Sequence, residues 1–181
     1  METGTTPSGH TGPRPNQSLN SSQALSGGST PAAFTAHEVP ELTECRVGEY
    51  AVGGMSHLER GTHTVAQCAL RVLMTVVSRP TPERAILDGG SKALSAAVLH
   101  QGDRSAMGHI VEYPAARLHG ASEEHAHVDV SACEPRPRIG ERVQVLPVHP
   151  CPCANEHDQI VALRRGRVEA VWPVDARGRM R

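Results

Sequence analysis

The sequence has few aromatic residues, only 2% of its 181 residues, and apolar residues of all kinds make up 38%. A core must therefore be built mainly from Val, Leu, Ile and Ala. The formal net charge is −1, so no overall field favours nucleic acid or an anionic membrane surface. No apolar run approaches the ~20 residues of a membrane-spanning helix, and the N-terminus lacks the pattern of a signal peptide. We expect a cytoplasmic protein that binds neither nucleic acid nor membranes.

The five cysteines do not form the regular framework of a small disulfide-bonded secreted domain. Reduced thiols are expected, and the close pair Cys151 and Cys153 is interpreted as metal-related or structural rather than as a disulfide. The eleven histidines make chance proximity of a histidine to a cysteine a serious alternative to any metal site.

The chain divides by composition. Residues 1–23 are almost all Gly, Ser, Thr, Pro, Asn and Gln, which is typical of a disordered tail. From about residue 64, short alternating or β-branched segments follow one another between turn signals, among them RVLMTVVSRP, GHIVEYP, HAHVDVS and ERVQVLPVHP. The segment DQIVALRRGRVEAVWP predicts a hairpin around Arg165 and Gly166. The pattern predicts a mainly β fold, a β-sandwich or barrel, without a clear amphipathic helix.

The segment VLPVHPCPCANEHD places His149 and Cys151 two residues apart. In an extended chain they share one face, with Cα atoms about 6.5–7 Å apart, so imidazole and thiolate can converge on one ion. Pro150 and Pro152 favour extended backbone at the residue before each. Two ligands with open coordination suit a Lewis-acid metal. Buried thiols near an unrelated histidine are the alternative.

Two other polar segments are candidates for a part in the site. His157 and Asp158 either orient His149 from behind or serve a turn or helix end. In ASEEHAHV, His125 lies among carboxylates, which could shift its proton affinity or add a ligand. A solvated loop that leads into a strand is the plainer interpretation of ASEEHAHV.

The stretch ALSGGSTPAA is a candidate anion-binding loop. Gly27, Gly28, Ser29 and Thr30 could bring backbone N–H groups and hydroxyls to an anion, although the same residues suit a linker. Lys92, just past a Gly-Gly turn in DGGSKALS, suggests a Schiff-base lysine, but a lysine in that position is usually solvated.

Taken in order, several motifs resemble one family: SGGSTP, TECRVGEY, CALRVLMTVVSRP, ERAILDGGSKALS, ARLHGASEEHAHV, IGERVQVLPVHPCPCANEHD and VDARGRM. They resemble the C-terminal part of the D-threonine aldolase and D-serine dehydratase-like family, pyridoxal 5'-phosphate enzymes of the alanine racemase fold type. Such enzymes have an α/β (TIM-type) barrel followed by a β-domain. The resemblance implies that residues 24–60 are a remnant of the end of the cofactor-binding barrel. Residues 61–181 would be the D-serine dehydratase-like β-domain with its metal site.

The resemblance also implies roles for single residues. His149 and Cys151 match the family's ligands for Zn²⁺ or another divalent metal, and a thiolate leans towards zinc. The loop Gly27–Thr30 matches the one that binds the cofactor phosphate, and His125 falls near the active site as a candidate catalytic residue.

The implied function is that of a lyase dependent on pyridoxal 5'-phosphate and a divalent metal, acting on small D-3-hydroxy amino acids. It would dehydrate D-serine to pyruvate and ammonia, or cleave D-threonine to glycine and acetaldehyde. Family members commonly pair as homodimers. Lys92, the chain's one lysine, matches the β-domain rather than the cofactor lysine. We therefore expect an inactive fragment that exposes apolar surface over residues 24–54. The alternative is a catalytically inactive β-domain or remnant that only binds metal.

Overall fold

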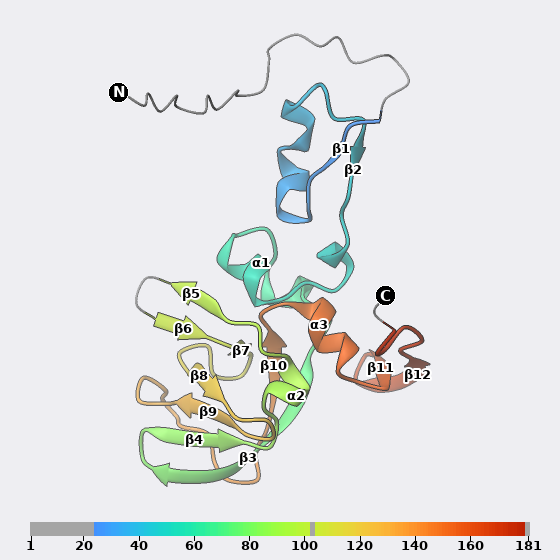
Figure 1. The fold of residues 1–181 in the computed structure, drawn as a ribbon. Helices are drawn as coiled ribbons and strands as arrows, with labels where there is room; N and C mark the ends of the chain where they lie inside the picture. The colour runs from blue at the N-terminus through green and yellow to red at the C-terminus, as the bar shows by residue number, and fades with distance from the viewer. Residues whose placement is uncertain (1–23, 102–103, 180–181) are drawn as a thin grey trace, which may run out of the picture.

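The computed structural model describes residues 24–101 and 104–179, and the predicted disordered tail, residues 1–23, lies outside the described residues. Figure 1 shows two parts, a barrel of strands and an arm, residues 24–52, that projects from one side of it. Within the described ranges, no helix is long and apolar enough to cross a membrane.

Six antiparallel strands form the barrel. They are β3 (Val72–Thr81), β4 (Arg84–Leu87), β7 (Gly108–Ile110), β8 (Arg117–Ala121), β9 (Ala126–Asp129) and β10 (Arg142–Pro147). Their order in the sheet is β7-β10-β3-β4-β9-β8. The two edges of the sheet meet, because the N–H of Met107, next to β7, donates to the carbonyl of Leu118 in β8 at 2.9 Å. The predicted mainly β fold is confirmed as a nearly closed barrel.

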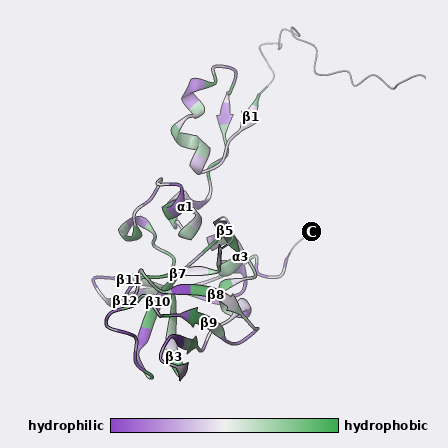
Figure 2. Cartoon of the chain, turned by 90° about the vertical axis from the view of Figure 1, so that its left-hand side faces the viewer, coloured by the Kyte–Doolittle hydropathy of each residue, from purple (hydrophilic) through white to green (hydrophobic). Residues whose placement is uncertain are grey.

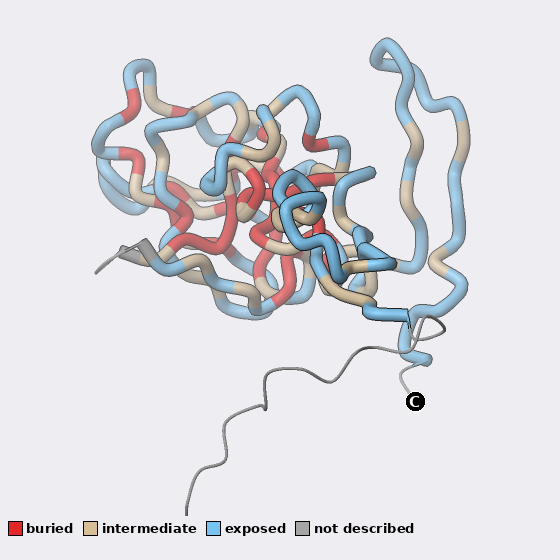
Figure 3. The backbone as a smooth tube through the Cα atoms, turned by 90° about the horizontal axis from the view of Figure 1, so that it is seen from above, coloured by how far each residue is buried: buried red, intermediate tan, exposed pale blue. Residues whose placement is uncertain are grey.

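Alternate residues of these strands form the core. Met74 and Val76 of β3 and Val143 and Val145 of β10 are all buried, as the two-residue period of a strand requires. Each such side chain contributes about 1.5–3 kcal/mol by leaving water. Hydrophobic residues follow the barrel strands in Figure 2, and the buried residues gather in the barrel in Figure 3. Among the described residues, the fully buried core contains no aromatic residue, and Tyr113 packs against its edge.

Shorter elements surround the barrel. Beside it lie the helices α1 (Met55–Glu59), α2 (Ser91–Leu94) and α3 (Pro150–Asn155) and the 3-10 helix η4 (Val65–Gln67). The 3-10 helices η1 (Pro31–Phe34), η2 (Ala36–Glu38) and η3 (Glu49–Ala51) belong to the arm. Two hairpins are β5 (Leu99–Gln101) with β6 (Arg104–Ala106), and β11 (Gln159–Arg164) with β12 (Arg167–Pro173). The second hairpin turns at Arg165 and Gly166, both with positive φ, so the predicted turn is confirmed.

The arm has almost no core of its own. Its strands β1 (Ser26–Gly27) and β2 (Glu44–Cys45) pair in parallel, as strands in α/β barrels do. Phe34 is 60% exposed and Tyr50 is 61% exposed, which confirms the predicted exposed apolar surface. The assignment of residues 24–60 to the end of a cofactor-binding barrel stays a prediction.

The extended conformation predicted through Cys151 is wrong. Strand β10 ends at Pro147, His149 is extended (φ −130°, ψ 115°), and α3 begins at Pro150. A proline at the first position of a helix sacrifices no helical hydrogen bond, because that N–H has no partner within the helix. This preference prevails over the tendency of a residue before proline to be extended, so Cys151 lies in the first turn of α3.

Candidate metal centre

Three side chains that can ligate a metal meet where the arm joins the barrel. Glu49, His149 and Cys151 each offer a ligand atom, and these atoms all lie within 4.8 Å of one another. Oε1 of Glu49 is 2.6 Å from Nε2 of His149. Glu49 begins η3, whereas His149 and Cys151 lie at the start of α3. The structure thus brings the two predicted ligands together and adds a carboxylate.

A glycine allows the chain after the arm to approach the end of β10. A Cβ atom at Gly54 would lie 3.0 Å from the carbonyl of Pro147 and 3.0 Å from Cδ of Pro150. The N–H of Ser56 donates to the carbonyl of Val148 at 3.2 Å. The start of α1 is therefore fixed against the backbone that presents His149.

Backbone hydrogen bonds also fix η3. The carbonyl of Glu49 accepts from the N–H groups of Val52 at 3.0 Å and Gly53 at 2.8 Å. Gly53 has φ of +61°, a conformation that favours glycine. The carbonyl of Val52 in turn accepts from Ala69 at 2.7 Å. Glu49 is thus held by its own turn and by the segment that leads into β3.

A second histidine faces Glu49. The side chain of His57 is 1% exposed, and its Nε2 lies 3.6 Å from Oε2 of Glu49. This Nε2 has no hydrogen-bond partner. Its Nδ1 lies 3.5 Å from Oγ of Ser56, and its ring meets that of His63 edge-on at 4.7 Å. Burial lowers the pKa of His57, which favours the neutral imidazole at pH 7.

The two neighbouring cysteines have different environments. Cys151 is exposed as a residue, yet partial burial of its thiol raises its pKa, and the charge of Glu49 raises it further. Cys153 is buried, its Sγ donates to the carbonyl of Ala93 at 3.3 Å, and burial raises its pKa to about 12. Cys153 is therefore a structural thiol. All five cysteines are free, as predicted.

The donor set fits a zinc ion. An imidazole nitrogen, a thiolate sulfur and a carboxylate oxygen are the three ligand types that zinc uses in proteins, and catalytic zinc sites keep a fourth position open. A thiolate disfavours Mg²⁺ and Ca²⁺, which prefer oxygen. The thiol of Cys151 must lose its proton when a metal binds.

The predicted phosphate loop lies in the arm, where packing explains its glycines. A Cβ atom at Gly27 would lie 2.8 Å from a methyl carbon of Leu42, and one at Gly28 would lie 2.8 Å from Sγ of Cys45. Gly28 also has φ of +81°. Gly28 thus has a conformation that favours glycine, and a side chain at Gly27 would have to displace Leu42.

The other half of the loop borders a pocket. Ser29 is exposed and its carbonyl accepts from the N–H of Ala33 at 3.0 Å. Thr30 is 5% exposed, its Oγ1 has no hydrogen-bond partner, and it lines a pocket with Tyr50 and His63. An unpaired buried hydroxyl can donate to an anion such as a phosphate oxygen, so Thr30 fits the predicted role better than its neighbours do.

His125 lies in an exposed turn between β8 and β9, outside the Glu49–His149–Cys151 group. The same turn contains Glu124, whose Oε1 is 2.5 Å from Nζ of Lys92 at the surface. The solvated interpretation of Lys92 is therefore confirmed.

His157 and Asp158 do not orient His149 in this structure. Nε2 of His157 lies 2.9 Å from the carbonyl of Ala93, which joins the end of α3 to α2. Asp158 pairs with Arg177. Both residues hold the turn after α3, which is the plainer of the two interpretations.

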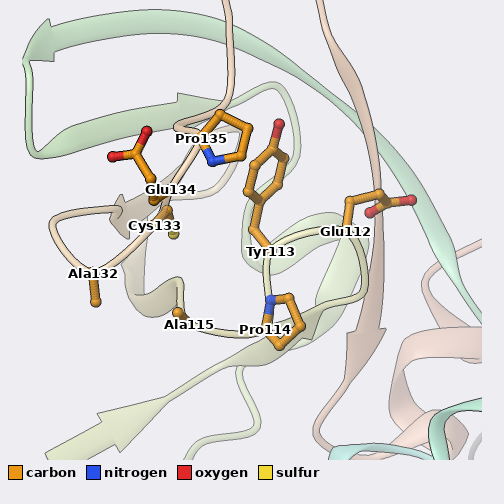
Figure 4. A pocket seen from close by; sticks show the side chains of 8 residues that line it. All are labelled: Glu112, Tyr113, Pro114, Ala115, Ala132, Cys133, Glu134 and Pro135. Atoms are coloured by element: carbon orange, nitrogen blue, oxygen red, sulfur yellow. The ribbon is translucent and has the colours of Figure 1, made fainter.

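A second pocket, shown in Figure 4, has other chemistry. Both pockets have volumes of about 350 Å³, so size does not distinguish them. In the second, the carboxylate of Glu112 already accepts from the backbone N–H of Gln144 at 2.8 Å, and the hydroxyl of Tyr113 donates to Glu141 at 2.5 Å. Glu112 and Tyr113 are thus paired within the protein, whereas the Oγ1 of Thr30 in the first pocket is not.

Sequence reasoning missed Glu49 and His57. Glu49 lies in the quoted motif TECRVGEY, but nothing local in the sequence indicates that it meets His149. His57 lies in the unremarked segment MSHLE. Only the tertiary contact between η3, α1 and the end of β10 reveals either residue.

Comparison with known proteins gives a family match over the barrel. The family described as "Putative serine dehydratase domain" matches residues 69–163. The chain is 32% identical to D-threonine aldolase of Arthrobacter sp over 85% of its length, and spans 39% of that enzyme. It is 35% identical to the uncharacterized protein Rv1414 of Mycobacterium tuberculosis over 71% of its length, and spans 98% of that protein.

The solved structures that are similar to the chain include enzymes of the same kinds. D-threonine aldolase from Filomicrobium marinum matches 86% of the chain with a TM-score of 0.70 and 27% identity, over 42% of the enzyme. D-threo-3-hydroxyaspartate dehydratase from Delftia sp. HT23 matches 83% with a TM-score of 0.68 and 26% identity, over 43% of the enzyme. A cysteine-to-alanine variant of the dehydratase has been solved in a metal-free form. The chain spans about two fifths of the length of these enzymes.

Proposed function

Because this chain belongs to the serine dehydratase-like domain family, we propose that it bears the metal site of a lyase acting on small D-3-hydroxy amino acids. The observation on which this depends is the convergence of His149 and Cys151, with Glu49, on one point. The relatives act on D-threonine and D-3-hydroxyaspartate according to their names. Each of these substrates has a hydroxyl on its β-carbon.

The three residues of the cluster would have different roles at the metal. His149 and Cys151, two residues apart in the chain, would hold the cation, and Glu49 would add negative charge beside them. A divalent cation held there supplies Lewis acidity to the β-hydroxyl, which favours either loss of hydroxide or cleavage of the Cα–Cβ bond. These ligands suit both reactions and do not select between D-serine and D-threonine.

Pyridoxal 5'-phosphate fits this chain only in part. Its chemistry, when it is bound, is that of an electron sink for the substrate's α-carbon. Thr30, with its unpaired hydroxyl in a pocket, suits the phosphate, and Gly27, Gly28 and Ser29 are proposed as the rest of that loop. Lys92 is exposed and paired with Glu124, so no lysine of this chain stands where the cofactor needs an anchor.

His125 remains a proposal as a catalytic residue. Its exposed turn packs on the start of α2, since the N–H of Ser91 donates to the carbonyl of Ser122 at 2.8 Å. Helix α2 in turn contacts α3 through the carbonyl of Ala93, which faces Cys153. His125 is therefore linked to the helix of the metal ligands through two packed segments, rather than directly.

The test uses the full chain loaded with Co²⁺, whose visible spectrum reports its ligands. Addition of D-threonine or D-serine should change the cobalt spectrum, whereas D-alanine, which lacks the hydroxyl, should not. The His149→Ala/Cys151→Ala double variant should show neither the thiolate–cobalt band nor the response. Cobalt binding without any response to the hydroxy amino acids would contradict the lyase proposal and favour the alternative, a catalytically inactive β-domain that only binds metal.

A further inference from the structure

The carboxylate at the candidate metal centre comes from a different part of the molecule than the other two ligands. Glu49 begins the last turn of the arm, whereas His149 and Cys151 lie at the start of α3, just after barrel strand β10. We propose that Glu49 is a third protein ligand of the metal, that His57 positions it, and that a bound cation fastens the arm to the barrel. This inference rests on the metal site of the proposed function and adds a ligand, a positioning residue and a structural role.

The fold itself positions Glu49 beside the other two candidate ligands. Its Oε1 lies 2.6 Å from Nε2 of His149 and within reach of Sγ of Cys151. The turn that presents it is held by the hydrogen bonds from Val52 and Gly53 to its carbonyl. A ligand that is already positioned loses little conformational freedom on binding, so more of its interaction with the cation appears as affinity.

His57 can donate a hydrogen bond to the carboxylate oxygen of Glu49 that faces away from the metal. Outer hydrogen bonds commonly orient metal-bound carboxylates. Nε2 of His57 is buried, lacks a partner, and faces Oε2 of Glu49 at 3.6 Å. Oγ of Ser56 lies 3.5 Å from Nδ1 and, as the donor there, favours the tautomer with its proton on Nε2. A small shift of the carboxylate towards His57 would complete that hydrogen bond.

Apart from the candidate metal ligands, the described residues of the arm are held mainly at its last turn, where the carbonyl of Val52 accepts from the N–H groups of Ala69 and Leu70. Within residues 24–52, Thr30 alone is buried, and the arm extends away from the barrel in Figure 1. Its last turn, η3, is the part that contacts the barrel near α3. A cation shared by η3 and α3 therefore links the two parts directly, as metals that close loops do.

The first experiment measures the affinity of the full chain for Zn²⁺ by competition with a chelator. Glu49→Gln keeps the shape of the side chain and removes its charge, and Glu38→Gln makes the same change at an exposed position of the same arm. Loss of an outer group costs about 10- to 100-fold in metal affinity, so loss of this ligand should cost about 100-fold or more. Glu38→Gln should bind as the wild type does.

The second measurement follows the arm by limited trypsin digestion after Arg46, which is exposed in the arm. Zn²⁺ should slow this cleavage in the wild type and in Glu38→Gln, but not in Glu49→Gln. Equal protection of Glu49→Gln would overturn the proposal that the metal fastens the arm.

His57 is tested by two variants that differ in one donor. His57→Leu removes the N–H and should weaken zinc binding about 10- to 100-fold, while His57→Gln, which offers an N–H, should restore most of it. The cobalt spectrum should change in His57→Leu and return in His57→Gln, a result that a purely packing role would not give. Unchanged affinity in His57→Leu would remove the positioning role.

Failure of this inference and failure of the proposed function are distinguishable. Zinc binding that depends on His149 and Cys151 but not on Glu49 contradicts the third ligand and leaves the metal site intact. Absence of zinc binding in the wild type contradicts both.

Discussion

Oε1 of Glu49 lies 2.6 Å from Nε2 of His149, although the two residues are 100 positions apart in the sequence. Their contact joins the arm to the barrel at the point where Cys151 also lies. A buried histidine, an ion pair and backbone hydrogen bonds all meet at this junction. The barrel itself is filled by a hydrophobic core.

Gly90→Ala should destabilise the fold strongly. A Cβ atom at Gly90 would lie 2.1 Å from the carbonyl oxygen of Ser122, and backbone cannot move aside as a flexible side chain can. Overpacking commonly lowers the free energy of unfolding by about 1–3 kcal/mol. For Gly90→Ala we expect a loss at the upper end of that range, measured by denaturant unfolding. Gly120→Ala, whose Cβ would meet nothing within 4 Å, is the control. Equal stability of the two variants would refute this packing.

Thiol reactivity should divide the cysteines by exposure. Cys45 and Cys151 are exposed, while Cys68, Cys133 and Cys153 are buried, the last with its pKa raised to about 12 by burial. A colorimetric disulfide reagent should therefore modify the first two in the native protein and all five after denaturation. Zinc should protect Cys151 and leave Cys45 reactive, which peptide mapping can show. Rapid native labelling of Cys153 would contradict the position of α3.

The hydrogen bond between Tyr113 and Glu141 should stabilise the fold at neutral pH and lose its effect in acid. This hydrogen bond lowers the pKa of Glu141 from its ordinary value of 4.5. The stability that the bond contributes is therefore fully present above pH 4.5, and it is lost as the pH falls through the lowered pKa. Tyr113→Phe should cost about 1 kcal/mol at pH 7, and the difference from wild type should shrink as the pH falls below 4.5. A constant difference across this range would show that the phenol acts by packing alone.

The sequence was sufficient for the strands and for part of the site. Alternation predicted the barrel strands, and Arg165 and Gly166 predicted the hairpin of β11 and β12. The spacing of His149 and Cys151 predicted that they act together, although a helix rather than a strand presents Cys151. That error arose because proline has opposite effects on its own residue and on the one before it.

The rest of the site depends on tertiary contacts that no local pattern encodes. Glu49 reaches His149 only because Gly54 lets the chain lie against Pro147 and Pro150. The unpaired Nε2 of His57 likewise becomes visible only when its burial is known. Pairing of the chain into a homodimer, which the resemblance implies, stays a prediction.

The central claim is that His149 and Cys151, with Glu49, hold a divalent metal. Elemental analysis of the purified chain, in the wild type and in His149→Ala/Cys151→Ala, tests it most directly. We predict about one zinc per wild-type chain and none in the double variant, with no turnover of D-serine above buffer in either protein. A wild type without metal, or a double variant that keeps its zinc, would contradict the account.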